Sequence, residues 1–220
     1  MVPAAGQGIR MGQKKPGLLL AGRPVLRWTL DVLEATPVVE GIVVTVPAED
    51  VADWEGRLAE CPKVRRVMAG GAERQESVRL GLGAVPGEVG FILVHDGVRP
   101  CITWELVARV VAEAQLHGAA IAALPVSETI KRGADGWVEE TVERDGLWAV
   151  QTPQVFRAEV LREAHRRAAA EGLAGTDDAV LVERLGVPVR LVPGLAGNLK
   201  LTRPEDLPLA EALLARRGGR

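Results

Sequence analysis

The chain begins with a loop whose composition suits it to hold a phosphate group. In the segment PAAGQGIRMG (3–12), four residues are small enough to let backbone N–H groups approach an anion closely. They are Ala4, Ala5, Gly6 and Gly8. Arg10 follows, and then Lys14 and Lys15, so the loop also carries cationic side chains. The alternative is an ordinary surface turn, because a single Gly-rich loop is weak evidence of function.

Two familiar phosphate loops do not match this segment. A P-loop requires Gly-Lys-Ser/Thr after its second glycine, and the chain has none there. The dinucleotide fingerprint requires G-x-G-x-x-G, but Met11 stands where the third glycine belongs. An Arg and two Lys in a flexible loop suit a triphosphate better than a dinucleotide.

A candidate metal ligand lies in VHDGVRP (94–100), at the end of an apolar run. Mg²⁺ typically takes one or two carboxylates together with substrate phosphates, so Asp96 is the candidate. The alternative is that Asp96 caps a turn or the next helix.

Two further segments suggest a nucleotide site. In GGAERQESV (70–78), the backbone near Gly71 and the hydroxyl of Ser77 are candidates for a small base pocket. The alternative there is a surface loop in which Glu73 and Arg74 pair with each other. In NLKLTRPEDL (198–207), we predict Lys200 within an apolar strand, where a lysine needs an anionic partner unless it faces solvent.

Two threonines are candidates to bind a phosphate or polyol. Thr152 in QTPQVF (151–156) and Thr176 in GTDDA (175–179) are both predicted to lie in loops, where a hydroxyl is free to donate. Either residue is alternatively a simple cap or turn residue.

Strands and helices alternate along the chain, which predicts how these residues are positioned. Apolar runs predict strands at 41–47, 91–97, 119–126 and 187–194. Amphipathic stretches predict helices at 24–36, 72–85, 103–118, 158–172, 177–186 and 204–217. The caps predicted for these helices are Thr103 and Thr176 at N-termini and Gly118, Gly172 and Gly186 at C-termini. This order predicts an α/β protein with a mostly parallel sheet covered on both faces, forming one domain over 1–220.

One segment departs from the alternation. Residues 128–148 contain two extended stretches around a Gly-Ala-Asp-Gly turn, which predicts a long β-hairpin inserted as an arm over 127–148. Because an isolated hairpin is marginal in water, we expect another surface to cover it.

Composition limits the classes of protein that fit. The chain has 220 residues, 47% of them apolar and 25% charged, and a formal net charge of −2. The near-neutral charge argues against nucleic-acid binding, and the chain contains neither an apolar run that would cross a bilayer nor a recognisable signal peptide. Cys61 and Cys101 do not have disulfide-scaffold or zinc spacing, so we expect reduced thiols and a cytoplasmic protein.

Taken together, the motifs resemble one enzyme family across essentially the whole chain. In order they are PAAGQGIRM, GGAERQESV, VHDGVRP, PVSETIKR, TVERDGLWAVQTPQVF, GTDDA and NLKLTRPEDL. The series resembles the 2-C-methyl-D-erythritol 4-phosphate cytidylyltransferases of the non-mevalonate isoprenoid pathway. The resemblance implies a Rossmann-like nucleotidyltransferase, a homodimer with exchanged arms, CTP and methylerythritol phosphate as substrates, and Mg²⁺.

The resemblance also implies roles for individual residues. CTP contacts are implied for Ala4, Ala5, Gly6, Gly8, Gly71 and Ser77. Reaction at the phosphates is implied for Arg10 and Lys200 and for one of the two loop lysines, of which we favour Lys15 because it is adjacent to the rigid Pro16, and metal binding is implied for Asp96. Contacts to the methylerythritol phosphate are implied for Arg99, Thr129, Arg144, Thr152 and Thr176. The implied reaction is an in-line attack of the acceptor phosphate on the α-phosphorus of CTP, aided by positioning and charge neutralisation.

The chain departs from the family pattern in two places. The family has Pro-Lys in its loop, whereas this chain has KKPG (14–17), which leaves open whether Lys14 or Lys15 contacts the triphosphate. Similar chains also have several more apolar residues before the first motif, so we expect either that the natural start lies upstream of Met1 or that the first strand is clipped.

Three alternative functions remain open from the sequence. One is a cytidylyltransferase with another polyol phosphate acceptor, such as ribitol phosphate. Another is a sugar-nucleotide glycosyltransferase, which would carry Asp-x-Asp where this chain has Val98 after Asp96-Gly97. The third is an inactive nucleotide-binding regulator, against which the presence of Arg10, Asp96 and Lys200 argues.

Overall fold

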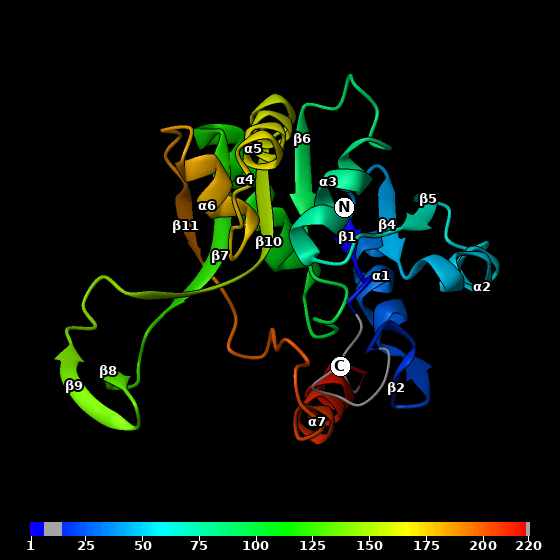
Figure 1. Ribbon diagram of the computed structural model, residues 1–220. Helices are drawn as coiled ribbons and strands as arrows, with labels where there is room; N and C mark the ends of the chain where they lie inside the picture. Colours follow the sequence, from blue (N-terminus) through cyan, green and yellow to red (C-terminus); the bar gives the residue numbers. More distant parts are fainter. Residues whose placement is uncertain (7–14, 219–220) are drawn as a thin grey trace.

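A central sheet with helices on both faces forms the body of the protein. The computed structural model describes residues 1–6 and 15–218 (Figure 1). The strands of the body are β1 (Val2–Pro3), β4 (Ile42–Val46), β5 (Val64–Ala69), β6 (Phe91–Val94), β7 (Ala119–Pro125), β10 (Trp148–Arg157) and β11 (Arg190–Pro193). Two small two-stranded sheets pair β2 (Leu19–Leu20) with β3 (Arg23–Pro24), and β8 (Ile130–Ala134) with β9 (Trp137–Val142).

The body sheet consists of two parts that meet edge to edge. One part has the order β5-β4-β1 and the other β6-β10-β7-β11. The amides of His95 and Gly97 donate to the carbonyls of Met1 and Pro3, which joins β1 to the end of β6. The pairs β1–β4, β4–β5 and β7–β11 are parallel, whereas β10 is antiparallel to β6 and β7. The predicted α/β class with a mostly parallel sheet is therefore confirmed.

Helices cover the two faces with separate apolar cores. They are α1 (Val25–Ala35), α2 (Val51–Arg57), α3 (Arg74–Leu82), α4 (Trp104–His117), α5 (Ala158–Glu171), α6 (Asp178–Glu183) and α7 (Asp206–Gly218), with short 3₁₀ turns at Lys15–Gly17 and Ala48–Asp50. Apolar residues of α3, α5 and α6 share one core with the sheet, and those of α1 and α4 pack in cores on the other side. None of the helices within residues 1–6 and 15–218 is long and apolar enough to cross a membrane.

The helix ends show which predicted caps are correct. The Thr103 side chain accepts a hydrogen bond from Leu106 N and so caps α4, and Gly118 and Gly172 end α4 and α5 in the left-handed conformation. The prediction that Thr176 caps α6 is wrong. Asp177 is the cap, because its carboxylate accepts from Val180 N.

Three other expectations about elements need correction. Residues 151–156, predicted as a loop, are part of β10, which places Thr152 inside the sheet. Lys200 does not lie in a strand, because its segment makes one backbone hydrogen bond to the body, from Leu201 N to Val98 O, and no ladder. Helix α2 was not expected from the sequence.

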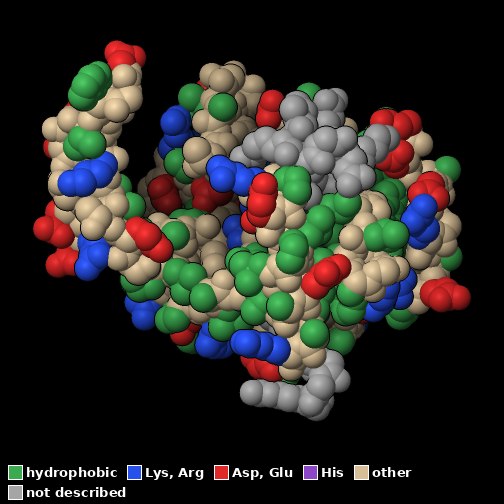
Figure 2. Space-filling view, turned by 90° about the horizontal axis from the view of Figure 1, so that it is seen from below, with side chains coloured by type: hydrophobic (Ala, Val, Ile, Leu, Met, Phe, Trp, Pro, Cys, Tyr) green, Lys and Arg blue, Asp and Glu red, His purple; other side chains and the backbone are tan. Residues whose placement is uncertain are grey.

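The strands β8 and β9 form a hairpin that projects from the body (Figure 1). In Figure 2 the hairpin stands apart from the rest of the molecule across a deep hollow. Asp135 and Gly136 form its tip with positive φ angles. Trp137 and Val138 are 80% and 65% exposed, so the hairpin offers apolar surface that its own chain leaves uncovered.

Candidate active site

The candidate site lies at the carboxyl ends of neighbouring parallel strands, where open α/β sheets bind ligands. Asp96 follows β6, and the segment from Ala4 follows β1. The loop that begins at Gly70 follows β5 and is joined to β4 by a hydrogen bond from Gly70 N to Val46 O of 2.8 Å. Three chain segments far apart in sequence therefore meet at one edge of the sheet.

Asp96 is a buried carboxylate surrounded by cations. Arg74 Nε lies 2.7 Å from its Oδ1, and Lys200 Nζ lies 2.7 Å from its Oδ2. Arg99 Nε is 3.7 Å from Oδ2. Burial opposes the charge of the Asp96 carboxylate, but Arg74 and Lys200 outweigh that effect and hold its pKa well below the ordinary range. Asp96 is therefore ionised at neutral pH.

Neutral polar groups hold the backbone beneath Asp96. The Asp96 amide donates to Thr152 Oγ1 at 3.1 Å, and the same hydroxyl lies 3.0 Å from His95 Nδ1. Burial lowers the pKa of His95 to about 3, so its ring is neutral at neutral pH. Thr152, predicted as a substrate contact, is buried and uses its hydroxyl within the protein.

Asn198 fixes the segment that carries Lys200. Its carbonyl accepts from Arg99 Nη1 at 2.8 Å, and its Nδ2 donates to Thr152 O at 2.7 Å. Gln151 Oε1 also accepts from Asn198 Nδ2. The predicted anionic partner of Lys200 is Asp96, supplied across the sheet edge.

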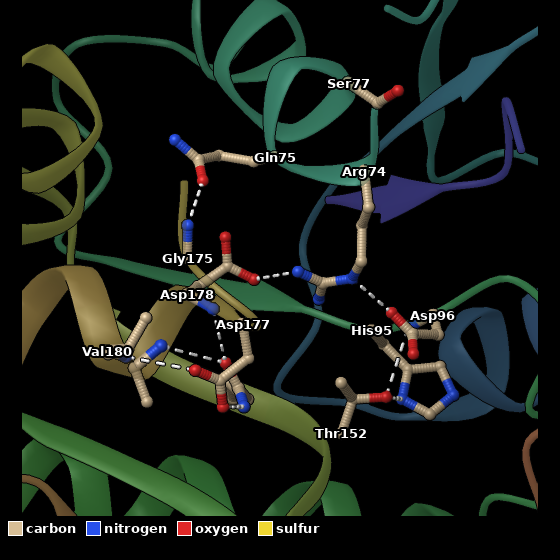
Figure 3. Close-up of polar contacts among 12 residues, drawn as sticks. Arg74, Gln75, Ser77, His95, Asp96, Thr152, Gly175, Asp177, Asp178 and Val180 are labelled. Carbon is tan, nitrogen blue, oxygen red and sulfur yellow. Dashed lines mark hydrogen bonds and ion pairs between the residues drawn. The ribbon is translucent and has the colours of Figure 1, made fainter. Parts of the chain in front are cut away.

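Arg74 and Asp178 belong to this cluster and were not anticipated (Figure 3). Arg74 Nη1 donates to Asp178 Oδ2 at 2.8 Å, while its Nε is bound to Asp96. The alternative in which Arg74 pairs with Glu73 on the surface is wrong, because the Arg74 side chain points toward Asp96 and Asp178. The only hint in the sequence is the Asp177-Asp178 pair, of which one residue caps α6 and the other is buried.

The glycine pair after β5 allows close packing of two loops. A Cβ placed on Gly70 would lie 2.3 Å from Ala5 Cβ and 2.7 Å from Ser77 Oγ, so only glycine fits. Ser77 Oγ accepts from Gly71 N at 3.1 Å and donates to Glu73 O at 3.0 Å. The candidate base-pocket residues Gly71 and Ser77 are thus adjacent to Ala5 of the first loop.

The loop that carries Thr176 is held by two glutamines. Gln75 Oε1 accepts from Gly175 N at 2.7 Å (Figure 3). Gln154 Nε2 donates to Asp177 Oδ2 at 2.7 Å. Gln154 Oε1 also accepts from Asp178 N at 3.2 Å. Thr176 itself is exposed between these fixed points.

The structure does not bring the hairpin residues to this cluster. Thr129 and Arg144 are exposed at the base of the projecting hairpin, where Arg144 Nη1 donates to Ser127 O of the same chain. The predicted residues Gly8 and Arg10, together with Lys14, lie outside the described residues, and the side chain of Lys15 is not described either.

The arrangement has a clear chemical preference. Two carboxylates, Asp96 and Asp178, face three cationic side chains, Arg74, Arg99 and Lys200, which leaves an excess of one positive charge that suits a polyanionic ligand. The neighbouring glycine loops supply backbone amides at the same edge. Polyphosphate binding with phosphoryl-group chemistry fits these features.

Comparison with known proteins gives one consistent family. The family model described as 2-C-methyl-D-erythritol 4-phosphate cytidylyltransferase matches residues 1–216. Similar proteins carry that name in Geobacter metallireducens, 47% identical and covering 97% of this chain and 96% of the relative, and in Symbiobacterium thermophilum, 49% identical and covering 97% and 91%. The crystal structure of the enzyme from Thermus thermophilus superposes with a TM-score of 0.81 at 38% identity, over 98% of this chain and 97% of the other.

Proposed function

The chain belongs to the 2-C-methyl-D-erythritol 4-phosphate cytidylyltransferase family, and we propose that the cluster around Asp96 is its reaction centre. The enzyme transfers the cytidylyl group of CTP to 2-C-methyl-D-erythritol 4-phosphate and releases pyrophosphate, in isoprenoid precursor biosynthesis by the non-mevalonate pathway. The family match over nearly the full length carries this assignment, and the cation-ringed carboxylate supports the location of the chemistry.

In the mechanism we propose, the protein positions two phosphates and neutralises their charge. A 4-phosphate oxygen of the acceptor attacks the α-phosphorus of CTP in line with the leaving pyrophosphate. The acceptor phosphate is already ionised, so no general base is needed. Lys200, released from Asp96, together with Arg10 and Lys15 of the first loop, offsets the negative charge that gathers at the reacting phosphates.

Asp96 fits a metal ion that is held mainly by substrate. Within residues 1–6 and 15–218, no three His, Cys, Asp or Glu side chains are grouped to form a complete metal site. Mg²⁺ often takes a single carboxylate and completes its shell with phosphate oxygens and water, so one buried, ionised Asp suffices. We propose that Asp96 holds Mg²⁺ in this way, and the bound ion would neutralise charge on the phosphates.

The proposed nucleotide contacts lie in two loops, the one that follows β1 and the one that follows β5. We assign the base pocket to Gly71 and Ser77 and the phosphate-wrapping loop to Ala4, Ala5, Gly6 and Gly8. The close packing of Ala5 on Gly70 supports this assignment, because it places the two loops beside each other.

The proposed acceptor contacts come from two chains. Arg99 and Thr176 lie on the body of one chain, close to Asp96 or on the clamped loop beside it. We propose that Thr152 acts on the acceptor only through Asp96, because its buried hydroxyl already binds the Asp96 amide. Thr129 and Arg144 lie on the projecting hairpin, and we propose that they reach the acceptor in the partner subunit of a homodimer formed by exchanged arms. The exposed Trp137 and Val138 support such an exchange, since burial against a second copy would cover them. We also propose a cytoplasmic location, because Cys61 and Cys101 are too few for a disulfide scaffold.

The function is tested by measuring pyrophosphate release from CTP with methylerythritol phosphate as acceptor. We expect turnover with CTP and little with UTP, ATP or GTP, because fixed polar groups in a small pocket reject a mismatched base strongly. Ribitol phosphate serves as the second acceptor, and equal or faster turnover with it would assign the chain to another polyol phosphate. Absence of pyrophosphate release with every pair would indicate an inactive nucleotide-binding protein.

A further inference from the structure

Arg74 joins two buried carboxylates that belong to different parts of the fold. Its Nε donates to Asp96 Oδ1 at 2.7 Å, at the end of β6, and its Nη1 donates to Asp178 Oδ2 at 2.8 Å, in the first turn of α6 (Figure 3). The side chains of Asp96 and Asp178 are 6% and 1% exposed. Both carboxylates of the bridge are therefore shielded from water, unlike those of a surface ion pair.

The far end of the bridge is firmly anchored. The other oxygen of Asp178, Oδ1, lies 2.9 Å from His165 Nε2, and both side chains are buried. The Asp178 amide donates to Gln154 Oε1. Asp178 is thus held by both its side chain and its backbone, and it gives Arg74 a fixed point.

The two oxygens of Asp96 have different surroundings. Oδ1 accepts from Arg74, whereas Oδ2 is faced by Lys200 at 2.7 Å and by Arg99 at 3.7 Å. Lys200 is the more exposed of these partners and is the one that phosphate would draw away. One oxygen is therefore held by the protein and the other is presented to the site.

We propose that Arg74 is a positioning residue that holds Asp96 Oδ1, so that Oδ2 stays directed at the metal and the phosphates. The same side chain ties the orientation of Asp96 to Asp178 at the start of α6, directly after the loop that carries Thr176. This inference rests on the proposed reaction centre. It adds a residue that acts through Asp96 and touches neither substrate.

The geometry calls for arginine specifically. A guanidinium offers several N–H donors in a rigid fork and can bind two carboxylates at once, whereas the ammonium of lysine is a point charge on a flexible stem. Burial opposes the charge of Arg74, but the attraction of Asp178 and Asp96 outweighs that effect and raises its pKa. Replacement by lysine therefore keeps the positive charge and removes the bridge between the two carboxylates. The variant thus distinguishes the effect of the bridging geometry from the effect of the charge.

The experiment compares Arg74→Lys with Arg162→Lys as a matched control. Arg162 lies on α5 and donates to the backbone carbonyls of Leu82, Val85 and Pro86, away from the cluster. For each variant we would measure thermal unfolding, kcat, KM for both substrates, and Mn²⁺ binding by electron paramagnetic resonance in the presence of CTP without acceptor. For Arg74→Lys we expect kcat and Mn²⁺ affinity each to fall about 10- to 100-fold, as for other groups that orient a metal ligand.

For Arg162→Lys we expect a lower unfolding temperature with kcat and Mn²⁺ affinity near wild type. If Arg74→Lys folds and keeps both quantities within about twofold of wild type, the positioning role is wrong. If that variant does not fold, Asp178→Asn decides. It removes the anchor while leaving Arg74 in place, and unchanged kcat and Mn²⁺ affinity in it would overturn the proposal. If the wild-type enzyme released no pyrophosphate, the proposed function would be wrong. The Mn²⁺ measurement would still test the role of Arg74, because it needs no turnover.

Discussion

At the scale of single residues, the site depends on one carboxylate, Asp96, that forms ion pairs with several cationic side chains. Asp96 balances Arg74 and Lys200 directly and lies near Arg99. A cation in a largely buried cluster is costly without a partner, so the carboxylate keeps these cationic side chains in place before any substrate arrives. The same negative charge makes Asp96 the proposed ligand for Mg²⁺.

Replacing Asp96 by Asn tests this double role. The amide is a poor ligand for a hard cation, and it leaves Lys200 without its counter-charge and Arg74 with Asp178 as its remaining carboxylate partner. We expect pyrophosphate release to fall by about 10²- to 10³-fold or more. We expect added Mg²⁺ to restore little of it. Asp31→Asn is the control, since Asp31 pairs with Arg23 and Arg27 on a half-exposed surface away from Asp96. If Asp96→Asn kept wild-type turnover at ordinary Mg²⁺ concentrations, Asp96 would not be a metal ligand and would have only a structural role in its turn.

At the scale of elements, β10 positions two loops through two glutamines. Gln151 binds Leu195 and Asn198, in the segment that leads to Lys200. Gln154 binds Asp177 and the amides at the start of α6, beside Thr176. One antiparallel strand therefore sets the place of a proposed reaction group and of a proposed acceptor contact.

Changing each glutamine to glutamate in turn separates the support of Lys200 from the support of the loop with Thr176. In Gln154→Glu the amide that donates to Asp177 is replaced by a buried carboxylate. The two carboxylates repel each other, so we expect the loop with Thr176 to move away from β10. We expect KM for the acceptor to rise about tenfold or more, equivalent to about 1.4 kcal/mol, with KM for CTP near wild type. In Gln151→Glu the hydrogen bond that Gln151 Nε2 donates to Leu195 O is lost. Because Leu195 lies in the segment that leads to Lys200, we expect kcat to fall. Steady-state kinetics at varied acceptor and CTP would reveal the split. The same pattern in both variants would mean that β10 supports only the general fold.

The elements also show how far sequence reasoning reaches. The periodicity of apolar residues located α1, α4 and α5 within a few residues, because packing against a sheet requires that spacing. It also placed Asp96 correctly, since carboxyl ends of strands follow from strand positions. It placed Thr152 wrongly, because polar Gln151 and Gln154 within a strand look like a loop until their partners across the sheet are known. Arg74 was missed for the same reason, as Asp96 and Asp178 are remote from it in sequence.

At the scale of the whole molecule, the hairpin is the feature that one chain does not explain. It projects from the body, and Trp137 remains 80% exposed (Figure 1). Arg144 uses its side chain to bind Ser127 of the same chain, while the proposed reaction centre lacks any contact from the hairpin among the described residues. A two-fold dimer in which each hairpin lies on the other body would cover the apolar surface and bring Arg144 to a site.

Mixing two inactive enzymes tests whether the hairpin acts on the partner subunit. Arg144→Ala damages the hairpin and Lys200→Ala damages the body, so each homodimer has two defective sites. When the two are unfolded and refolded together, a heterodimer contains one site with both lesions and one site with neither, provided the hairpin acts in trans. Random pairing of equal amounts makes half of the dimers mixed, so we expect about a quarter of wild-type activity to return. A mixture refolded from Arg144→Ala and wild type, matched in concentration, controls for losses during refolding. If tagged heterodimers form and no activity returns, Arg144 serves its own chain, because every site in the mixture then carries one lesion.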